Sequence, residues 1–324
     1  MGQTTDRLPE RFEFTQFQMG MNFRVVLYAP DEDSANAAAS AAYARIKQLN
    51  GLMSDYEPQS ELMQLCRTAG LGKQVPVSRD LLAVLSHSLA LSKKSDGAFD
   101  VTVGPVVKLW RKARRTKQFP AVDELAAARE LVGFRHLRVD EQAGAVELLK
   151  PGMLLDLGGI AVGYAVDEAL AVLQARGITS ALIDGSGDIG VSDPPPGQAG
   201  WRIGIAPLDA DKDPSRYLIL KNAAVTTSGD AFQFVEFDGK RYSHIIDPQT
   251  GLGLLDRSSV TVIARNCTIA DSYTKAVSVL GPERGLKLID ETPGAAAIIV
   301  RAPQGKVESF ESMRLKDYQF EEPE

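Results

Sequence analysis

The stretch RYSHIIDPQTG, residues 241–251, is the part of the chain that says most about the fold around it. Its first half, residues 242–246, is rich in strand-forming residues. Its second half, DPQTG, is a turn sequence, because proline fixes φ at the second turn position and Gly251 supplies a positive φ after it. We therefore expect a strand over residues 242–246 that runs into a rigid turn, with His244 just ahead of that turn.

The histidine at position 244 has two interpretations. Imidazole is the side chain whose unperturbed pKa lies nearest neutrality, so a histidine between a strand and a turn can serve as a general base in a cleft. A single histidine can also be a hydrogen-bonded structural residue, and that is the commoner case. His244 alone does not separate the two interpretations, so the motifs around it have to do so.

Helices and strands alternate in the first half of the chain, whereas strands dominate between residues 180 and 265. Helices are expected at residues 31–53, 78–94, 106–110, 122–131, 160–176, 270–280 and 283–289. This order predicts an α+β fold with mixed or antiparallel sheets and flanking helices. Residues 1–16 are expected to form a flexible N-terminal arm. Residues 17–324 are expected to form a single unit, either undivided or made of two closely packed α/β subdomains.

The composition excludes one class of partner. The chain has 324 residues and a formal net charge of −6, which does not suit binding to a nucleic-acid backbone. One basic cluster stands out, made of Lys108, Arg111, Lys112, Arg114, Arg115 and Lys117. We expect a solvated helix face there, with a contact for an anionic ligand or an acidic partner as the alternative.

The two cysteines, Cys66 and Cys267, lie far apart and form no CxxC motif, so they indicate neither a zinc site nor a redox motif. We expect two buried free thiols rather than a disulfide. No apolar run approaches the roughly 20 residues that cross a bilayer. The polar N-terminus lacks the apolar core of a signal peptide. The compartment is left open, since the chain is either cytoplasmic or a form from which a signal has been removed.

Two glycine-rich segments could approach a ligand. GSGDIG at residues 185–190 matches GxGxxG, but three prolines follow where a dinucleotide fold needs a helix, so we interpret it as a turn. LLDLGGI at residues 154–160 places Asp156 ahead of a helix, with Gly158 and Gly159 beside it. That arrangement suits either close backbone approach to a ligand or a helix cap with packing glycines.

Five segments come in a recognisable order: GAFDVTVGP at residues 97–105, LDLGGIAVGYAVD at 155–167, TSGD at 227–230, YSHIIDPQTG at 242–251 and AD at 270–271. With these segments the chain resembles the FAD:protein FMN transferases, also called ApbE-type proteins, over nearly its whole length. Members of that family cleave the pyrophosphate of FAD and transfer FMN to a Ser or Thr hydroxyl of a partner protein, releasing AMP. The resemblance implies FAD as a substrate. It also implies an acceptor protein, typically a subunit of a membrane redox complex, and a periplasmic or membrane-anchored location if a signal was removed.

The resemblance also implies roles for individual residues. His244 is similar to the base that activates the acceptor hydroxyl. The flavin pocket corresponds to Met19, Tyr56, Ala98, Phe99, Asp100, Asp156, Ile245 and Ile246. A magnesium ion would offset charge on the pyrophosphate. Its ligands correspond to the backbone of Gly159 and the side chains of Asp271 and Thr274.

The chain departs from the family pattern at two positions. Lys275 stands where the family normally has a Thr that binds the metal, and an ammonium has no lone pair to give a cation. Lys275 follows Asp271 by four residues on the expected helix, so the two should pair. Val162 stands where the family usually has Lys or Glu, and it can neither pair with a phosphate nor accept a hydrogen bond.

Three hypotheses follow from these departures. The chain is a flavin transferase with magnesium at Asp271 and Thr274. Alternatively, it is a transferase or an FAD pyrophosphatase in which the Lys275 ammonium replaces the metal. In the third hypothesis it is a non-catalytic FAD-binding protein that has lost the metal site. The retained His244 and TSGD favour an enzyme, whereas Lys275 and Val162 favour the third.

Overall fold

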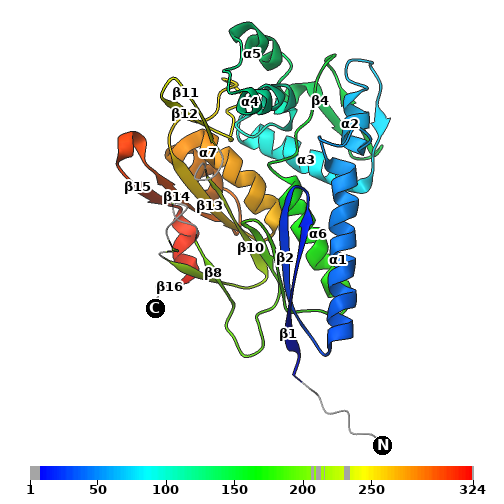
Figure 1. Cartoon of the computed structure of the whole chain (residues 1–324), viewed down its shortest axis with the longest axis vertical. Helices are drawn as coiled ribbons and strands as arrows, with labels where there is room; N and C mark the ends of the chain where they lie inside the picture. The colour runs from blue at the N-terminus through cyan, green and yellow to red at the C-terminus, as the bar shows by residue number, and fades with distance from the viewer. Residues whose placement is uncertain (1–7, 206–207, 209–212, 215, 230–233, 323–324) are drawn as a thin grey trace, which may run out of the picture.

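The computed structural model describes residues 8–205, 208, 213–214, 216–229 and 234–322. A central eight-stranded sheet organises it, in the order β1-β2-β6-β7-β10-β13-β14-β15, and every neighbouring pair is antiparallel. Its strands are β1 (Glu10–Gln18), β2 (Met21–Ala29), β6 (Ala181–Gly185), β7 (Asp188–Val191), β10 (Ala223–Gly229), β13 (Ser258–Ala264), β14 (Ala296–Arg301) and β15 (Glu308–Glu311). Figure 1 shows this sheet running through the middle of the molecule.

Three long helices cover one face of the central sheet: α1 (Glu32–Met53), α6 (Ala161–Ala175) and α7 (Cys267–Asp290). Helix α1 buries the alanines Ala35, Ala38, Ala39 and Ala42, and such small side chains let it pack closely on α6. Helix α6 in turn packs against α7 and the sheet. The main hydrophobic core therefore lies between the sheet and these helices.

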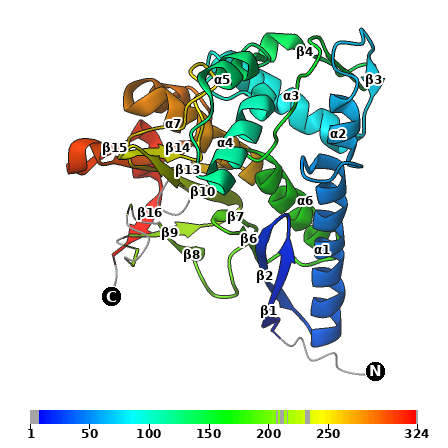
Figure 2. The ribbon, with the colours of Figure 1, turned by 45° about the horizontal axis from the view of Figure 1, so that its top comes forward.

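The opposite face of the sheet carries a three-stranded sheet in the order β16-β9-β8: β8 (Trp201–Gly204), β9 (Tyr217–Leu220) and β16 (Gln319–Glu321). Figure 2 shows it on the other side of the central sheet from α6 and α7. Strand β2 explains how one sheet serves two cores. Val25 and Leu27 pack in the core under the helices, whereas Val26 packs in the second core. Alternation along the strand places them on opposite faces.

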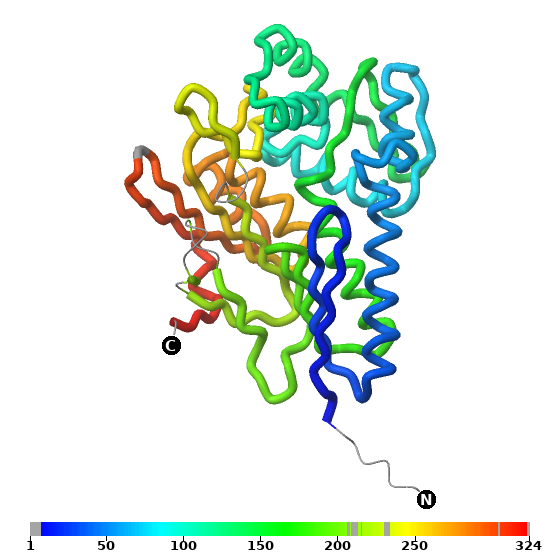
Figure 3. Tube along the Cα trace, viewed as in Figure 1, coloured from blue at the N-terminus to red at the C-terminus, as the bar shows by residue number. Residues whose placement is uncertain are grey.

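The remaining elements lie beyond one end of the sheet (Figure 1). They are α2 (Glu61–Cys66), α3 (Arg79–Lys94), α4 (Gly104–Thr116) and α5 (Val122–Arg129), the sheet of β3 (Val75–Pro76), β4 (Leu137–Asp140) and β5 (Ala145–Leu148), and the hairpin of β11 (Phe234–Phe237) and β12 (Lys240–Ser243). Short 3₁₀ helices occur at Val101–Val103, Phe134–His136, Pro303–Gly305 and Met313–Asp317. Figure 3 shows the hairpin beside α4 and α5. The contact is aromatic: Trp110 of α4 packs against Phe237 and Tyr242 of the hairpin.

The structure confirms the α+β class with antiparallel sheets and flanking helices. The flexible arm predicted over residues 1–16 is wrong from Glu10 onward, because β1 pairs along its whole length with β2. Its residues alternate, and Phe12 and Phe14 pack on the core while their neighbours face outward. Residues 1–7 lie outside the described part. Whether the unit divides into two subdomains stays a prediction.

The structure confirms most of the local predictions and corrects one. GSGDIG is a tight turn between β6 and β7, as expected, and not a dinucleotide cradle. The strand expected at residues 242–246 ends at Ser243, because the chain bends there, and only Ile246 makes an isolated bridge, to Gly253. Both cysteines are free and buried. Helix α7 is broken at Gly281, where the sequence placed the boundary between two helices. No helix among the described residues is long and apolar enough to cross a membrane.

Candidate active site

Helix α7 carries Asp271, whose side chain is only 1 % exposed. Its two carboxylate oxygens have different partners. The backbone N–H of Gly163, in α6, donates to Oδ2 at 3.1 Å, and the Lys275 ammonium donates to Oδ1. A Cβ at position 163 would lie 2.8 Å from the Asp271 Cβ and would clash with the Cys267 carbonyl oxygen. Gly163, the third glycine of LDLGGIAVGYAVD, therefore lets the backbone of α6 come close enough to donate a hydrogen bond to Asp271.

Lys275 lies at the junction of several predicted site residues. Its side chain is 20 % exposed, and its stem passes Gly159, where an added Cβ would lie 3.3 Å from the lysine Cγ and 3.4 Å from the Phe99 ring. Burial works against the charge on Lys275, but Asp271 and Asp188 outweigh it, so its pKa is raised. The ammonium is therefore charged at neutral pH, and the sequence-based expectation that Lys275 pairs with Asp271 is met in the structure.

Asp188, at the start of β7, belongs to the same charged group. Burial, and next the charge of Asp271, raise the pKa of the Asp188 carboxyl, while the Lys275 ammonium opposes that rise. Sequence reasoning missed Asp188 because it lies inside the rejected GxGxxG segment. The signal that could have identified it is an acidic residue at the first position of a strand whose other residues are apolar.

The residues that correspond to the magnesium site do not fit a metal ion in this arrangement. Both oxygens of Asp271 have partners, one of them a cation. The Thr274 hydroxyl is fully buried, 2.6 Å from the Asp271 carbonyl oxygen and 2.9 Å from the Ser228 hydroxyl. With one proton, it donates to the carbonyl and accepts from Ser228. No group of three or more His, Cys, Asp or Glu within the described ranges could hold a metal ion.

The predicted flavin-pocket residues Tyr56 and Asp156 are brought together by a residue that the sequence did not single out for this role. The Arg111 guanidinium, on α4, pairs with Asp55 and donates to Asp156 Oδ2 at 2.8 Å. It also lies 4.3 Å from the centroid of the Tyr56 ring, which is 72 % exposed. The expectation of a wholly solvated basic face is therefore wrong at Arg111, because its carboxylate partners lie far away in the sequence. The exposed Lys112 pairs with the exposed Glu124, as expected for a solvated face.

Asp156 is almost completely enclosed. Its Oδ1 accepts the Gly158 N–H at 2.8 Å, and its own N–H donates to the Val101 carbonyl oxygen at 2.8 Å. Burial raises the pKa of its carboxyl, the charge of Asp55 adds to the rise, and Arg111 opposes it. Asp156 is thus both a turn-stabilising residue and a carboxylate whose charge depends on Arg111.

The other predicted pocket residues have mixed surroundings. Ala98 and Phe99 are 5 % exposed, and Asp100 accepts hydrogen bonds from the N–H groups of Thr102 and Phe134 at 2.8 and 2.7 Å. Met19 lies in the turn between β1 and β2 and packs on the main core. Ile245 is buried, and Ile246 packs on the aromatic cluster at α4. Phe99 is the one of these that the structure places beside Gly159 and Lys275.

His244 is half-buried and follows the end of β12 by one residue. The turn after it is held from outside by two helices. Trp110 Nε1 donates to the Gly251 carbonyl oxygen at 2.8 Å, and Arg129 Nη2 donates to that of Gln249 at 2.6 Å. Within the turn, Asp247 accepts the Gln249 N–H at 2.8 Å. The predicted rigid turn is confirmed. The last residue of the TSGD segment, Asp230, lies outside the described residues.

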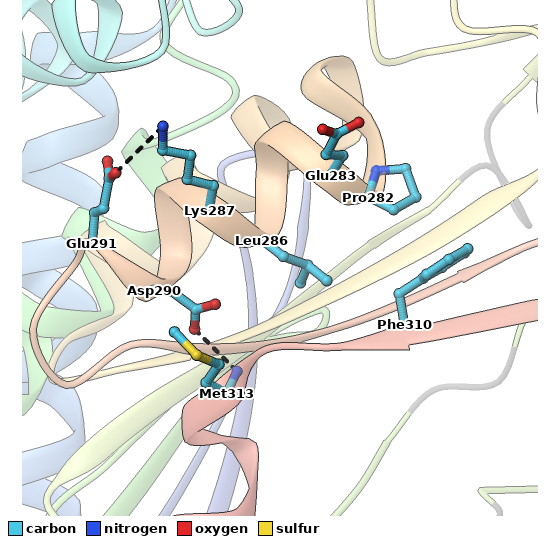
Figure 4. Close-up of a pocket in the computed structure, with 8 residues that line it drawn as sticks. All are labelled: Pro282, Glu283, Leu286, Lys287, Asp290, Glu291, Phe310 and Met313. Carbon is cyan, nitrogen blue, oxygen red and sulfur yellow. Dashed lines mark hydrogen bonds and ion pairs between the residues drawn. The ribbon is translucent and has the colours of Figure 1, made fainter.

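Two hollows border α7. A cavity of about 470 Å³ lies between the turn after His244, through Asp247 and Thr250, and the helix at Val277 and Ser278. A second hollow of about 770 Å³ lies beyond the break in α7, between Leu286, Phe310 and Met313 (Figure 4). None of the predicted site residues lines either of these two hollows. The first hollow is related to the candidate active site through the turn that follows His244, which forms part of its wall.

Comparisons with known proteins identify the family and agree with the fold. The family model of the ApbE family matches residues 19–299. An FAD:protein FMN transferase of Klebsiella pneumoniae (strain 342) is 33 % identical over 294 residues, covering 89 % of this chain and 83 % of its own length. One of Treponema pallidum (strain Nichols) is 35 % identical over 280 residues, covering 82 % and 77 %. Among solved structures, the flavin transferase ApbE from Vibrio cholerae superimposes with a TM-score of 0.87 at 28 % identity, covering 96 % of this chain and 100 % of that one. The ApbE protein of Thermotoga maritima gives 0.85 at 29 %, covering 97 % and 100 %.

Proposed function

The chain belongs to the ApbE family, and from this premise we propose that it transfers FMN from FAD to a Ser or Thr hydroxyl of an acceptor protein. The proposal rests mainly on the contacts of two consecutive residues of α4. Trp110 holds the turn that follows His244, and Arg111 holds Asp156 and Tyr56. One rigid helix therefore fixes the proposed base relative to the proposed flavin pocket, as a transfer reaction requires.

The proposed chemistry uses His244 as a general base. His244 takes the proton of the acceptor hydroxyl, and the hydroxyl oxygen attacks the phosphorus atom of the FMN half of FAD. The bond between that phosphorus and the bridging oxygen breaks, AMP leaves, and a phosphodiester links FMN to the acceptor. A general base of this kind contributes typically about 10²–10⁴-fold to the rate.

Magnesium has no step in the proposal, since the residues at Asp271 and Thr274 do not fit it as they stand. The same ion pair favours a second candidate, in which the protein binds FAD without transferring FMN. Hydrolysis is the third, in which water replaces the acceptor hydroxyl and FMN and AMP are both released. The retained base and its rigid turn support transfer over these two.

The experiment that tests the proposal separates all three by their products. The purified protein is incubated with FAD and an acceptor domain, and with the same domain carrying Ala in place of its acceptor residue. Flavin fluorescence on a denaturing gel and released AMP are measured together. Transfer gives covalent flavin and equal AMP only with the intact acceptor. Hydrolysis gives AMP with both domains, and bound but intact FAD leaves only the non-catalytic candidate.

The acceptor and the compartment remain predictions. A subunit of a membrane redox complex is the proposed acceptor, and it would place the reaction in the periplasm or at the membrane surface. Neither FAD affinity nor transfer to a purified domain depends on where the protein resides. Localisation of a tagged full-length protein by cell fractionation, alongside the acceptor, tests this part separately.

A further inference from the structure

The side chain of Asp188 points into the layer between the central sheet and helices α6 and α7. In the antiparallel register Asp188 lies opposite both Thr226 and Gly185, and residues that face each other across strands share a face of the sheet. The Thr226 hydroxyl is 3.7 Å from the Cys267 sulfur of α7. A Cβ on Gly185 would lie 2.8 Å from Val162 of α6. The Asp188 side chain therefore faces the layer between the sheet and the helices, on the side of α7.

Two acidic side chains thus face the layer that holds the Lys275 ammonium. Asp271, on the same helix, accepts a hydrogen bond from that ammonium, and Asp188 faces the helices from β7 of the sheet. Val162, where the family pattern usually has Lys or Glu, packs instead on the Gly185 backbone and close to Phe23. At this point of the site the positive charge therefore comes from α7 and not from α6.

We propose that the Lys275 ammonium, held by Asp271 with Asp188 on the facing side of the sheet, is the built-in cation of this active site and takes the place of a divalent metal ion. This inference rests on the proposed function, since it concerns the charge that faces the FAD pyrophosphate. It assigns Asp188 a role as the second carboxylate of the site. The ammonium is fixed by the fold, so the site needs no metal for its positive charge.

The Lys275 ammonium weakens the binding of a divalent cation at this place by electrostatic repulsion. Two unit charges about 4 Å apart at an effective dielectric of about 20 repel enough to weaken binding roughly several hundred-fold, and a double charge is repelled more strongly. With Lys275 replaced by a neutral oxygen donor, the same two carboxylates would become attractive ligands for magnesium, which prefers oxygen.

The test measures metal binding directly on the full-length protein, by calorimetric titration with MgCl₂ and by the shift of the unfolding temperature with MgCl₂. The unmodified protein should show no magnesium binding below millimolar concentration. Lys275→Thr should bind magnesium at least a hundredfold more tightly, and Lys275→Thr combined with Asp188→Asn should lose most of that gain. Lys287→Thr, an exposed lysine later on the same helix, is the matched control and should behave as the unmodified protein does.

Three results would overturn the inference. The first is micromolar magnesium binding by the unmodified protein. The second is no gain in Lys275→Thr, or in the near-isosteric Lys275→Gln if the threonine variant does not fold. The third is a gain that Asp188→Asn leaves unchanged, which removes Asp188 from the site. None of these readouts involves transfer, so a protein that gains a metal site but never flavinylates an acceptor refutes the proposed function alone.

Discussion

Replacing Arg111 by methionine tests how the flavin-pocket half of the site is held. Methionine keeps most of the apolar stem and removes the guanidinium. The change leaves Asp156, whose side chain is 10 % exposed, without the cation that pairs with it. It also removes the guanidinium that stacks over the Tyr56 ring and pairs with Asp55.

The magnitude follows from the exposure of the partners. Breaking a fully buried ion pair from one side costs about 3–5 kcal/mol. Arg111 and Asp55 are 27 % and 19 % exposed in their side chains, so solvent screens part of this cost. The stacking on the exposed Tyr56 adds about 0.5–1 kcal/mol. We expect a loss of about 2–3 kcal/mol in the free energy of unfolding. At roughly 2 °C per kcal/mol for a chain of this size, the unfolding temperature should fall by about 5 °C.

The loss of stability should depend on pH, and the Asp156 carboxyl determines whether it grows or shrinks as the pH rises. Its pKa in the folded protein is already raised, and removing Arg111 raises it further. A carboxyl whose pKa is higher in the folded than in the unfolded state favours folding at low pH and costs stability as the pH rises toward and past the folded pKa. The deficit of Arg111→Met should therefore be larger at pH 8 than at pH 5.

Urea unfolding at pH 5 and pH 8 measures the free energy of unfolding of each variant. Titration with FAD measures whether the flavin pocket still binds its ligand. Arg115→Met is the matched control: Arg115 is exposed on the same helix, and a substitution there should change stability by no more than about 0.5 kcal/mol. Equal stability losses in the two variants, or an Arg111→Met deficit that does not change with pH, would refute the claim that Arg111 compensates Asp156.

Three further predictions concern the reaction. His244→Ala should keep FAD binding and slow transfer by about 10²–10⁴-fold in single-turnover assays; loss of flavin binding or of the fold would make His244 structural instead. Trp110→Phe keeps the aromatic packing but loses the hydrogen bond to the Gly251 carbonyl, worth about 1 kcal/mol, so transfer should slow roughly fivefold at unchanged FAD affinity; a parallel loss of FAD affinity would count against a role limited to the turn. Titration should show tighter binding of FAD than of FMN, because the pocket residues span both halves of the chain; equal affinities would mean that the adenylate half is not held.

Much of the fold could be predicted from local sequence, because local physics determines it. The turn at residues 247–251 follows from Pro and Gly, and the break at Gly281 follows from Gly-Pro inside a helical pattern. The prolines after GSGDIG were enough to reject a dinucleotide cradle. The N-terminal strand was missed although Phe12 and Phe14 alternate with polar residues as in a half-buried strand. Its pairing with β2 and its packing on α1 complete it.

The charged part of the site was harder to predict from the sequence, because it depends on contacts between segments that are distant in the chain. The pairing of Lys275 with Asp271 could be predicted from their spacing on one helix. Arg111 is 56 residues from Asp55 and 45 residues from Asp156 in the sequence. No local sequence pattern predicts contacts over such separations. Asp188 is turned toward the helices by the pairing of β7 with β10, which joins segments distant in the sequence. Long-range electrostatics of this kind requires the fold.

If the Lys275 ammonium supplies the positive charge that a metal ion would otherwise bring, transfer of FMN from FAD should not depend on magnesium. Covalent flavin on an acceptor domain is measured over time in excess EDTA and in excess MgCl₂. We expect equal rates in the two conditions, with His244→Ala inactive in both. Transfer that stops in EDTA and returns with magnesium would refute the substitution of the metal by Lys275.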